Sequence, residues 1–257
     1  MTDSAETRVG APETASPASA EPPSDLSLDI TVPAKGPAWQ KHAPPRPGWV
    51  YSLAKWFLAP ALIVLFKIRV VGQERVPETG PVIIAGNHLS YMDPLLICLA
   101  EPRSRPVHFM AKLVLFSHGA FFSWLLRSLH AFPVRRGAAD RQAISTASDI
   151  LKRGGIVGIF PEGTRIRGDK TSQGEEGAAF IAMHTGTPIV PVGICGTDRI
   201  QPPGDKHWHF VPLNTYFGEP IDPASFEGTR KERLAAMTAA VMAGIDDAKY
   251  HADCAVR

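Results

Sequence analysis

Histidine and aspartate stand five positions apart in the stretch AGNHLSYMDPLL, residues 85–96. A carboxylate that is hydrogen-bonded to one imidazole nitrogen fixes the tautomer of the ring, and the other nitrogen can then take a proton from a hydroxyl group. His88 and Asp93 would thus supply two of the three members of a Ser-His-Asp triad. The third member would be either a protein serine such as Ser90 or a hydroxyl group of the substrate.

The same two residues also have a purely structural explanation. Asp93 precedes Pro94, and an aspartate before a proline is a favoured start of a helix, so Asp93 is expected to cap one. His88 would then be a polar residue in a strand-to-helix loop. The structural and chemical roles of Asp93 do not exclude each other, and the spacing alone does not choose between them.

A second group of reactive side chains occurs in GIFPEGTRIRGDK, where an apolar run is followed by a tight turn. Gly163 allows a positive φ or a close approach in that turn. Thr164 offers a hydroxyl group, and Arg165 offers a planar fork of donors that suits a phosphate. HAFPVRRGAADR adds an arginine pair, Arg135 and Arg136, after another short apolar run. For Arg135 and Arg136, plain surface charge is the commoner case, and for the turn a solvated arginine after an ordinary strand is the alternative. Side by side, the two patches could complete an anion site.

Short apolar runs alternate with helical patterns along most of the chain. Strands are expected at residues 68–71, 82–85, 108–111, 132–134, 156–160, 189–194 and 214–217. Helices are expected at residues 94–100, 139–152, 174–184 and 230–249. This alternation predicts an α/β fold with one largely parallel or mixed sheet flanked by helices. Ligands of such sheets bind beyond the carboxyl ends of the strands.

The composition divides the 257 residues into an N-terminal tail and one folded unit. Residues 1–48 hold nine of the 24 prolines and no long apolar run, which predicts a disordered tail. The tail has no basic start followed by an apolar region, so it does not resemble a secretory signal. The folded domain is expected over residues 68–250, with residues 49–67 as a separate helical segment before it.

Residues 49–67 and 113–126 are apolar, aromatic and edged by cations. In the first segment only eleven uncharged residues separate Lys55 from Lys67, whereas a spanning helix needs ~20 apolar residues. A helix that lies in the membrane interface is therefore expected there. A core helix kinked at Pro60 is the alternative.

The net charge of +2 conceals a basic middle third, because residues 103–170 carry twelve basic and four acidic residues. Such an excess predicts an anionic partner: a phosphate, a nucleic acid or a membrane surface. No readout motif or stacking platform accompanies it, so nucleic-acid binding is not expected. The cysteines at 98, 195 and 254 have no metal or redox spacing, so no metal site is expected and a reducing cytosol suits the chain.

Four ordered blocks of the chain resemble the glycerolipid acyltransferases, of the 1-acylglycerol-3-phosphate (lysophosphatidic acid) acyltransferase type. The blocks are NHLSYMD at 87–93, FPVRR at 132–136, FPEGTR at 160–165 and IVPV at 189–192. The resemblance runs from about residue 51 to about residue 220. Four blocks in the family's order are far more specific than any one block.

The resemblance implies an enzyme that moves a fatty acyl group from acyl-CoA or acyl carrier protein, without a cofactor, to the free hydroxyl of lysophosphatidic acid. The product would be phosphatidic acid. His88 would be the general base and Asp93 would orient it, so the substrate would supply the hydroxyl that the triad lacks. Residues 68–250 would be the acyltransferase domain, attached peripherally or monotopically to the cytoplasmic face of a membrane. The acceptor phosphate would be held by Lys112, Arg136, Glu162, Gly163, Thr164 and Arg165.

Three alternatives stay open from the sequence. The same chemistry could act on another lysophospholipid, on glycerol 3-phosphate or on an acyl-amino-acid lipid. A non-catalytic membrane-binding module would have no reason to keep the complete set of His88 with Asp93 and Glu162 with Arg165. A hydrolase based on Ser90 lacks support, since no Gly-x-Ser-x-Gly elbow occurs in the chain.

Overall fold

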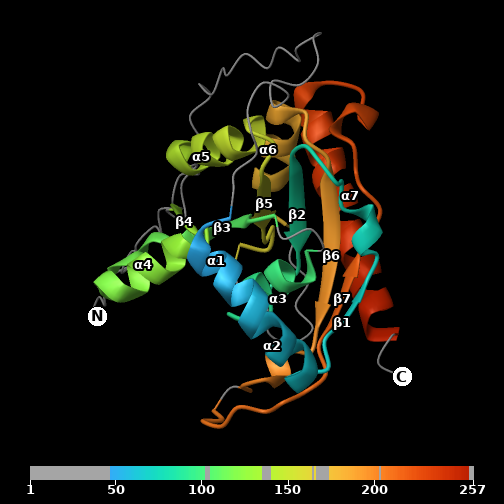
Figure 1. The fold of residues 1–257 in the computed structure, drawn as a ribbon. Coiled ribbons are helices and arrows are strands. Elements are labelled where there is room, and N and C mark those ends of the chain that lie inside the picture. The colour runs from blue at the N-terminus through green and yellow to red at the C-terminus, as the bar shows by residue number, and fades with distance from the viewer. Residues whose placement is uncertain are drawn as a thin grey trace, which may run out of the picture. The chain divides into compact units, whose positions relative to one another are not determined.

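The computed structural model describes residues 47–101, 105–134, 140–163, 165, 174–202 and 204–254. Figure 1 shows how their helices and strands are arranged. The predicted N-terminal tail, apart from residues 47 and 48, lies outside the described residues, and so do Arg135, Arg136 and Thr164.

The described strands form one seven-stranded sheet in the order β1-β7-β6-β2-β5-β3-β4 (Figure 1). All neighbouring strands run parallel except β6 and β7, so the predicted largely parallel or mixed sheet is confirmed. Each of the seven predicted strands is present, with ends within one residue of those expected. The strands are β1 (Arg69–Val71), β2 (Val82–Gly86), β3 (Val107–Lys112), β4 (Phe132–Val134), β5 (Ile156–Ile159), β6 (Ile189–Cys195) and β7 (Asn214–Phe217).

Helices cover both faces of the sheet. The predicted helical segment 49–67 contains α1 and α2, and the four further predicted helices correspond to α3, α5, α6 and α7. α4 was not predicted; it begins inside the apolar stretch 113–126 and ends two residues beyond it. α5 begins two residues later than expected because the side chain of Asp140 caps it by accepting hydrogen bonds from the amides of Gln142 and Ala143. The helices are α1 (Trp49–Leu53), α2 (Ala59–Leu65), α3 (Asp93–Ala100), α4 (Ala120–Ser128), α5 (Arg141–Lys152), α6 (Gly177–Thr185) and α7 (Arg230–Cys254).

The central strand β2 is apolar without alternation because it is buried on both faces. Ile83 and Ala85 point into a core formed with α5, α6 and α7. Val82 and Ile84 point into a second core formed with α3 and the segment that follows α2. The sheet therefore separates two cores, and its strand ends are held from both sides.

α1 and α2 are joined by a π-helical turn, Ala54–Leu58, into one helical segment. The turn ends two residues before Pro60, which has no amide hydrogen to donate to the preceding turn and so favours such a bulge. The segment buries Tyr51 and Ala59 but leaves Trp56 and Phe57 each 74% exposed, so it is not a buried core helix. Within the described residues, none of the helices has both the length and the hydropathy needed to cross a bilayer.

Lys55 connects this helical segment to the C-terminal end of α3 by hydrogen bonds. Its ammonium group donates to the carbonyl oxygens of Cys98 (3.0 Å) and Glu101 (2.5 Å) and lies 3.5 Å from the carboxylate of Glu101. Burial lowers the pKa of Lys55, and the charge of Glu101 acts in the opposite direction. The apolar helical segment is thus held against the helix that begins at Asp93.

Candidate functional site

The carboxyl ends of neighbouring strands bring together most of the residues that the sequence singled out. His88 follows β2, Glu162 and Arg165 follow β5, and Lys112 ends β3. These three strands are adjacent and parallel, so the residues after them lie at one edge of the sheet. Arg136, two residues beyond β4, and Thr164 lie outside the described residues.

His88 and Asp93 form the predicted pair. The Nδ1 atom of His88 lies 2.8 Å from Oδ2 of Asp93, and the two side chains are 12% and 0% exposed. The imidazole ring is stacked on Phe160, with ring centroids 4.2 Å apart. Within the described residues the Nε2 atom of His88 makes no hydrogen bond, which leaves this nitrogen able to meet a substrate.

The carboxylate of Asp93 accepts three further hydrogen bonds. Oδ2 accepts from the amides of Leu89 (2.6 Å) and Ser90 (2.7 Å), and Oδ1 accepts from the hydroxyl of Thr197 (2.5 Å). The prediction that Asp93 caps a helix is wrong, because α3 begins at Asp93 and no side chain caps it. The carboxylate instead points to the tight loop before the helix, where its Oδ2 atom is hydrogen-bonded to two backbone amides and to the imidazole.

The hydroxyl of Ser90 is not hydrogen-bonded to His88, as an activated serine nucleophile would be. Its hydroxyl oxygen accepts a hydrogen bond from the amide of Met92 at 3.4 Å. Among the described residues, no serine hydroxyl is hydrogen-bonded to the imidazole of His88. The geometry therefore favours a hydroxyl that arrives with a substrate.

Glu162 supports the loop that carries His88. Its carboxylate accepts a hydrogen bond of 3.0 Å from the backbone amide of His88. Burial raises the pKa of Glu162, although this hydrogen bond acts in the opposite direction. Any contribution of Glu162 to an anion site is therefore indirect, because its carboxylate is occupied and carries the same sign as a phosphate.

Gly163 has both properties that the sequence suggested. Its φ is +64°, and a Cβ atom at this position would collide with the carboxylate of Glu175. The positive φ favours glycine here, whereas the flexible end of the Glu175 side chain could move aside for a Cβ atom. The turn after β5 can therefore be this tight, which brings Arg165 back toward the loop of His88.

Arg165 is held by Tyr91, a residue that the sequence analysis did not select. The guanidinium carbon lies 3.8 Å from the centroid of the Tyr91 ring, and Nη2 donates to the Tyr91 hydroxyl at 3.1 Å. Tyr91 belongs to the loop between His88 and Asp93 and is 67% exposed. The described part of the chain provides no hydrogen-bond partner for Lys112, which is exposed at the end of β3.

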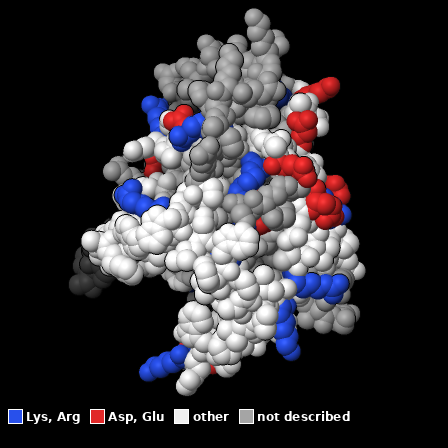
Figure 2. Space-filling view, in the orientation of Figure 1, with Lys and Arg blue, Asp and Glu red and all other residues white. Residues whose placement is uncertain are grey.

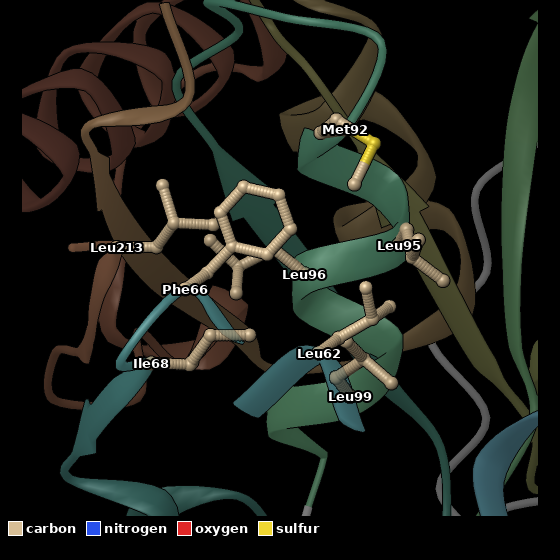
Figure 3. Close-up of a pocket in the computed structure, with 8 residues that line it drawn as sticks. All are labelled: Leu62, Phe66, Ile68, Met92, Leu95, Leu96, Leu99 and Leu213. Atoms are coloured by element: carbon tan, nitrogen blue, oxygen red, sulfur yellow. The ribbon is translucent and has the colours of Figure 1, made fainter. Parts of the chain in front are cut away.

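A shallow apolar hollow lies between α2 and α3, close to Asp93 (Figure 3). It has about 210 Å³ of empty volume, part of which is open to solvent. The cavity volume proper is only about 10 Å³, room for about one water molecule, so we assign no substrate to it. Its lining is apolar throughout: Leu62, Phe66, Ile68, Met92, Leu95, Leu96, Leu99 and Leu213.

Thr197 was also missed by the sequence analysis. It follows β6, outside the four blocks, and no spacing in the sequence links it to Asp93. Tyr91 was inside the first block, but its partner Arg165 is 74 residues away. Such contacts depend on which strands become neighbours in the sheet.

Comparison with known proteins identifies similar chains. The sequence model of the acyltransferase family matches residues 67–195, half of the chain. A 1-acyl-sn-glycerol-3-phosphate acyltransferase of Bacillus subtilis is 34% identical over 190 residues, which are 72% of this chain and 92% of that protein. A protein of the same name from Borreliella burgdorferi is 35% identical over 142 residues, 52% of this chain and 53% of the relative.

A solved structure is similar in fold as well. The crystal structure of the 1-acyl-sn-glycerophosphate (LPA) acyltransferase PlsC from Thermotoga maritima aligns with a TM-score of 0.55 and 27% identity. The alignment covers 77% of this chain and 83% of that chain. The matched family region includes His88, Asp93 and the turn after β5.

Proposed function

This chain belongs to the acyltransferase family, and we propose that it transfers a fatty acyl group to the free hydroxyl of lysophosphatidic acid, which gives phosphatidic acid. The acyl donor in this proposal is acyl-CoA or acyl carrier protein. One observation carries it: His88 is aligned by the buried Asp93 at 2.8 Å, while its Nε2 atom is left for a substrate hydroxyl. The names of the relatives support the acceptor.

The proposed reaction proceeds in one displacement of the thiol. Nε2 of His88 takes the proton of the acceptor hydroxyl, whose oxygen attacks the thioester carbonyl. The tetrahedral intermediate collapses, the C–S bond breaks, and the leaving thiolate receives the proton from the imidazolium. Asp93 stabilises that imidazolium without taking its proton, as in a Ser-His-Asp triad. No acyl-enzyme forms, because the substrate provides the nucleophile.

The acceptor phosphate is assigned to the turn after β5 and to the neighbouring strand ends. Arg165 supplies a planar fork for two phosphate oxygens, and Gly163 lets the turn approach them. Lys112, Arg136 and Thr164 complete the proposed site from the next strands and from the turn itself. Glu162 contributes by holding the backbone of His88 beside it.

The proposed binding partner on the outside is a phospholipid surface, at the cytoplasmic face of a membrane. In this proposal the enzyme is attached peripherally or monotopically, in a compartment that keeps Cys98 and Cys195 as thiols. Figure 2 shows a mainly uncharged surface over α1, α2 and α4, with Lys and Arg side chains at its margins. Aromatic side chains edged by cations are typical of interfacial segments.

Three segments of the described chain carry exposed large apolar side chains. Besides those of α1 and α2, Phe121 and Trp124 of α4 are exposed. The loop before β7 adds Trp208 and Phe210, and the Phe210 ring lies 5.4 Å from the ring of Phe66, which follows α2. A greasy anionic acceptor could thus be bound without full extraction into water.

The proposed reaction is tested by thiol release from palmitoyl-CoA, with and without lysophosphatidic acid. Release that requires the acceptor supports acyl transfer. Release without it would indicate thioester hydrolysis and would remove the argument that the substrate supplies the hydroxyl. If neither condition releases thiol, a panel of acyl-carrier-protein donors and other lysophospholipid acceptors tests the same chemistry. A panel without any turnover would leave a membrane-binding module as the better explanation.

The proposed surface is tested by flotation with vesicles of phosphatidylcholine and phosphatidylglycerol. Replacing Trp56 and Phe57 together by alanine should weaken binding at least about fivefold, because both side chains would leave the interface. Tyr250→Ala is the control, since Tyr250 is an aromatic residue of similar exposure on α7. Equal binding of both variants would remove α1 and α2 from the membrane contact.

A further inference from the structure

We infer that Thr197 is a positioning residue, whose hydroxyl holds the carboxylate of Asp93 in the orientation that aligns His88 for proton transfer. The inference rests on the proposed general-base role of His88. Thr197 opens the short 3-10 helix Thr197–Arg199 after β6, and it lies outside the residues matched by the family model. It reaches the site through Asp93 and has no part in the chemistry itself.

The first argument is how the two carboxylate oxygens of Asp93 are shared. Oδ2 accepts from the imidazole of His88 and from the amides of Leu89 and Ser90. Among the described residues, only the hydroxyl of Thr197 donates to Oδ1, at 2.5 Å. The last torsion of an aspartate has a broad minimum, so a carboxylate held by one oxygen can rotate. A donor at the second oxygen removes that rotation and keeps Oδ2 facing the imidazole.

The second argument is burial. Asp93 is 0% exposed and Thr197 is 1% exposed. When a buried oxygen loses its hydrogen-bond donor, the free energy of its desolvation is no longer offset by a hydrogen bond. Loss of the Thr197 hydroxyl would therefore drive the carboxylate to turn toward another donor, at the expense of its bond with His88.

The third argument is how rigidly the backbone places Thr197. The side-chain amide of Asn87 donates to the carbonyl of Ile194 (2.9 Å), and its oxygen accepts from the amide of Ile194 (2.7 Å). Asn87 thus continues the pairing of β2 with β6 beyond Gly86, directly before His88. Gly196 then turns the chain with φ +92°, at a position where a Cβ atom would collide with the carbonyl of Pro212. One pair of strand ends therefore carries both the proposed base and the group that aligns its partner.

The test is Thr197→Val, which keeps the shape of the side chain and removes the donor. We expect kcat to fall about tenfold, the cost of a buried acceptor without its donor. The KM of each substrate should stay within about twofold, because Thr197 touches neither. Thr197→Ser restores the hydroxyl and should recover kcat to within about threefold of the wild type. Thr197→Ala, which is smaller, replaces the valine variant if the latter does not fold.

A double variant separates this role from a structural one. If Thr197 acts only through His88, Thr197→Val should not lower the residual activity of His88→Ala any further. The inference is overturned by an unchanged kcat in folded Thr197→Val, by a failed rescue with serine, or by the same tenfold loss in both backgrounds. If His88→Ala itself keeps nearly full activity, the proposed base role has failed, and the inference fails with it.

Discussion

The two ends of the site are built differently. At the end formed by β2 and β6, His88, Asp93 and Thr197 are joined by hydrogen bonds of 2.5–2.8 Å, and the carboxylate between them is fully buried. At the end formed by β5 and β3, Arg165 rests on an exposed tyrosine, and Lys112 is exposed at a strand end. At the first end, hydrogen bonds and burial fix the positions of the side chains. At the second end, long cationic side chains are exposed to solvent.

This contrast matches the two tasks proposed for the site. Proton transfer requires aligned atoms within hydrogen-bond distance, and a misplacement of ~1 Å can cost ~10²-fold in rate. Attraction between a cation and a phosphate falls off more gradually with distance, so long side chains can adapt to the ligand. In the proposed function, the buried end serves the chemistry and the exposed end serves capture of the acceptor.

The largest expected effect is at the buried end. His88→Ala should lower kcat by ~10²–10⁴-fold, because it removes the proposed general base. Thiol release at saturating lysophosphatidic acid measures this, and thermal unfolding checks that the variant is folded. A loss of less than about tenfold would contradict the base role. His88→Gln, which keeps a polar side chain of similar length, should be as inactive as the alanine variant.

A smaller and different effect is expected at the exposed end. Arg165→Met should raise the KM for lysophosphatidic acid about 10–100-fold, as expected for the loss of charged hydrogen bonds, while kcat changes less. Arg75→Met is the matched control, since Arg75 lies over the ring of Tyr216 at 5.0 Å, next to the far edge strand β1. A fall in kcat with an unchanged KM would place Arg165 in the chemical step and erase the contrast between the ends.

The role of Tyr91 tests how the exposed end is preorganised. Tyr91→Phe keeps the ring under Arg165 but removes the hydroxyl, so the KM for the acceptor should rise only about two- to threefold. Tyr91→Ala removes the whole platform and should raise it about fivefold or more. Steady-state kinetics over a range of acceptor concentrations distinguishes the two. Wild-type kinetics in Tyr91→Ala would show that Arg165 needs no support from the loop of His88.

The smallest effect is expected at Glu162, which joins the two ends. Burial raises its pKa, so the folded protein binds this proton more tightly than the unfolded chain, and the ionised form costs stability as pH rises through the raised pKa. Glu162→Gln keeps an oxygen for the amide of His88 without the charge. It should therefore unfold at a slightly higher temperature than the wild type at neutral pH.

The pH dependence of that difference is the control. The gap between Glu162→Gln and the wild type should close as pH falls below 4.5, the ordinary pKa of the side chain, where the wild-type carboxyl is protonated in both states. Thermal unfolding followed by circular dichroism at several pH values measures the gap. A variant less stable than the wild type at neutral pH would mean that the negative charge itself holds the loop.

The centre of the sheet could be predicted well because β2, β5 and β6 are short apolar runs that are buried on both faces. The helix α4 could not be predicted, because its aromatic residues would form an apolar surface equally well in a helix or in an extended segment. The close spacing of His88 and Asp93 allows their contact, but its prediction also needed the other blocks of the chain. The positions of Arg136 and Thr164 stay predictions.

By itself the sequence determined which reactive groups are present, in what order, and that each follows an apolar strand. Local spacing was sufficient for this, because a strand and the loop after it are formed by neighbouring residues. Only the tertiary structure decided where the carboxylate of Asp93 points. That direction depends on the loop amides and on Thr197, which lies 104 residues away along the chain but beside Asp93 once β6 has paired with β2.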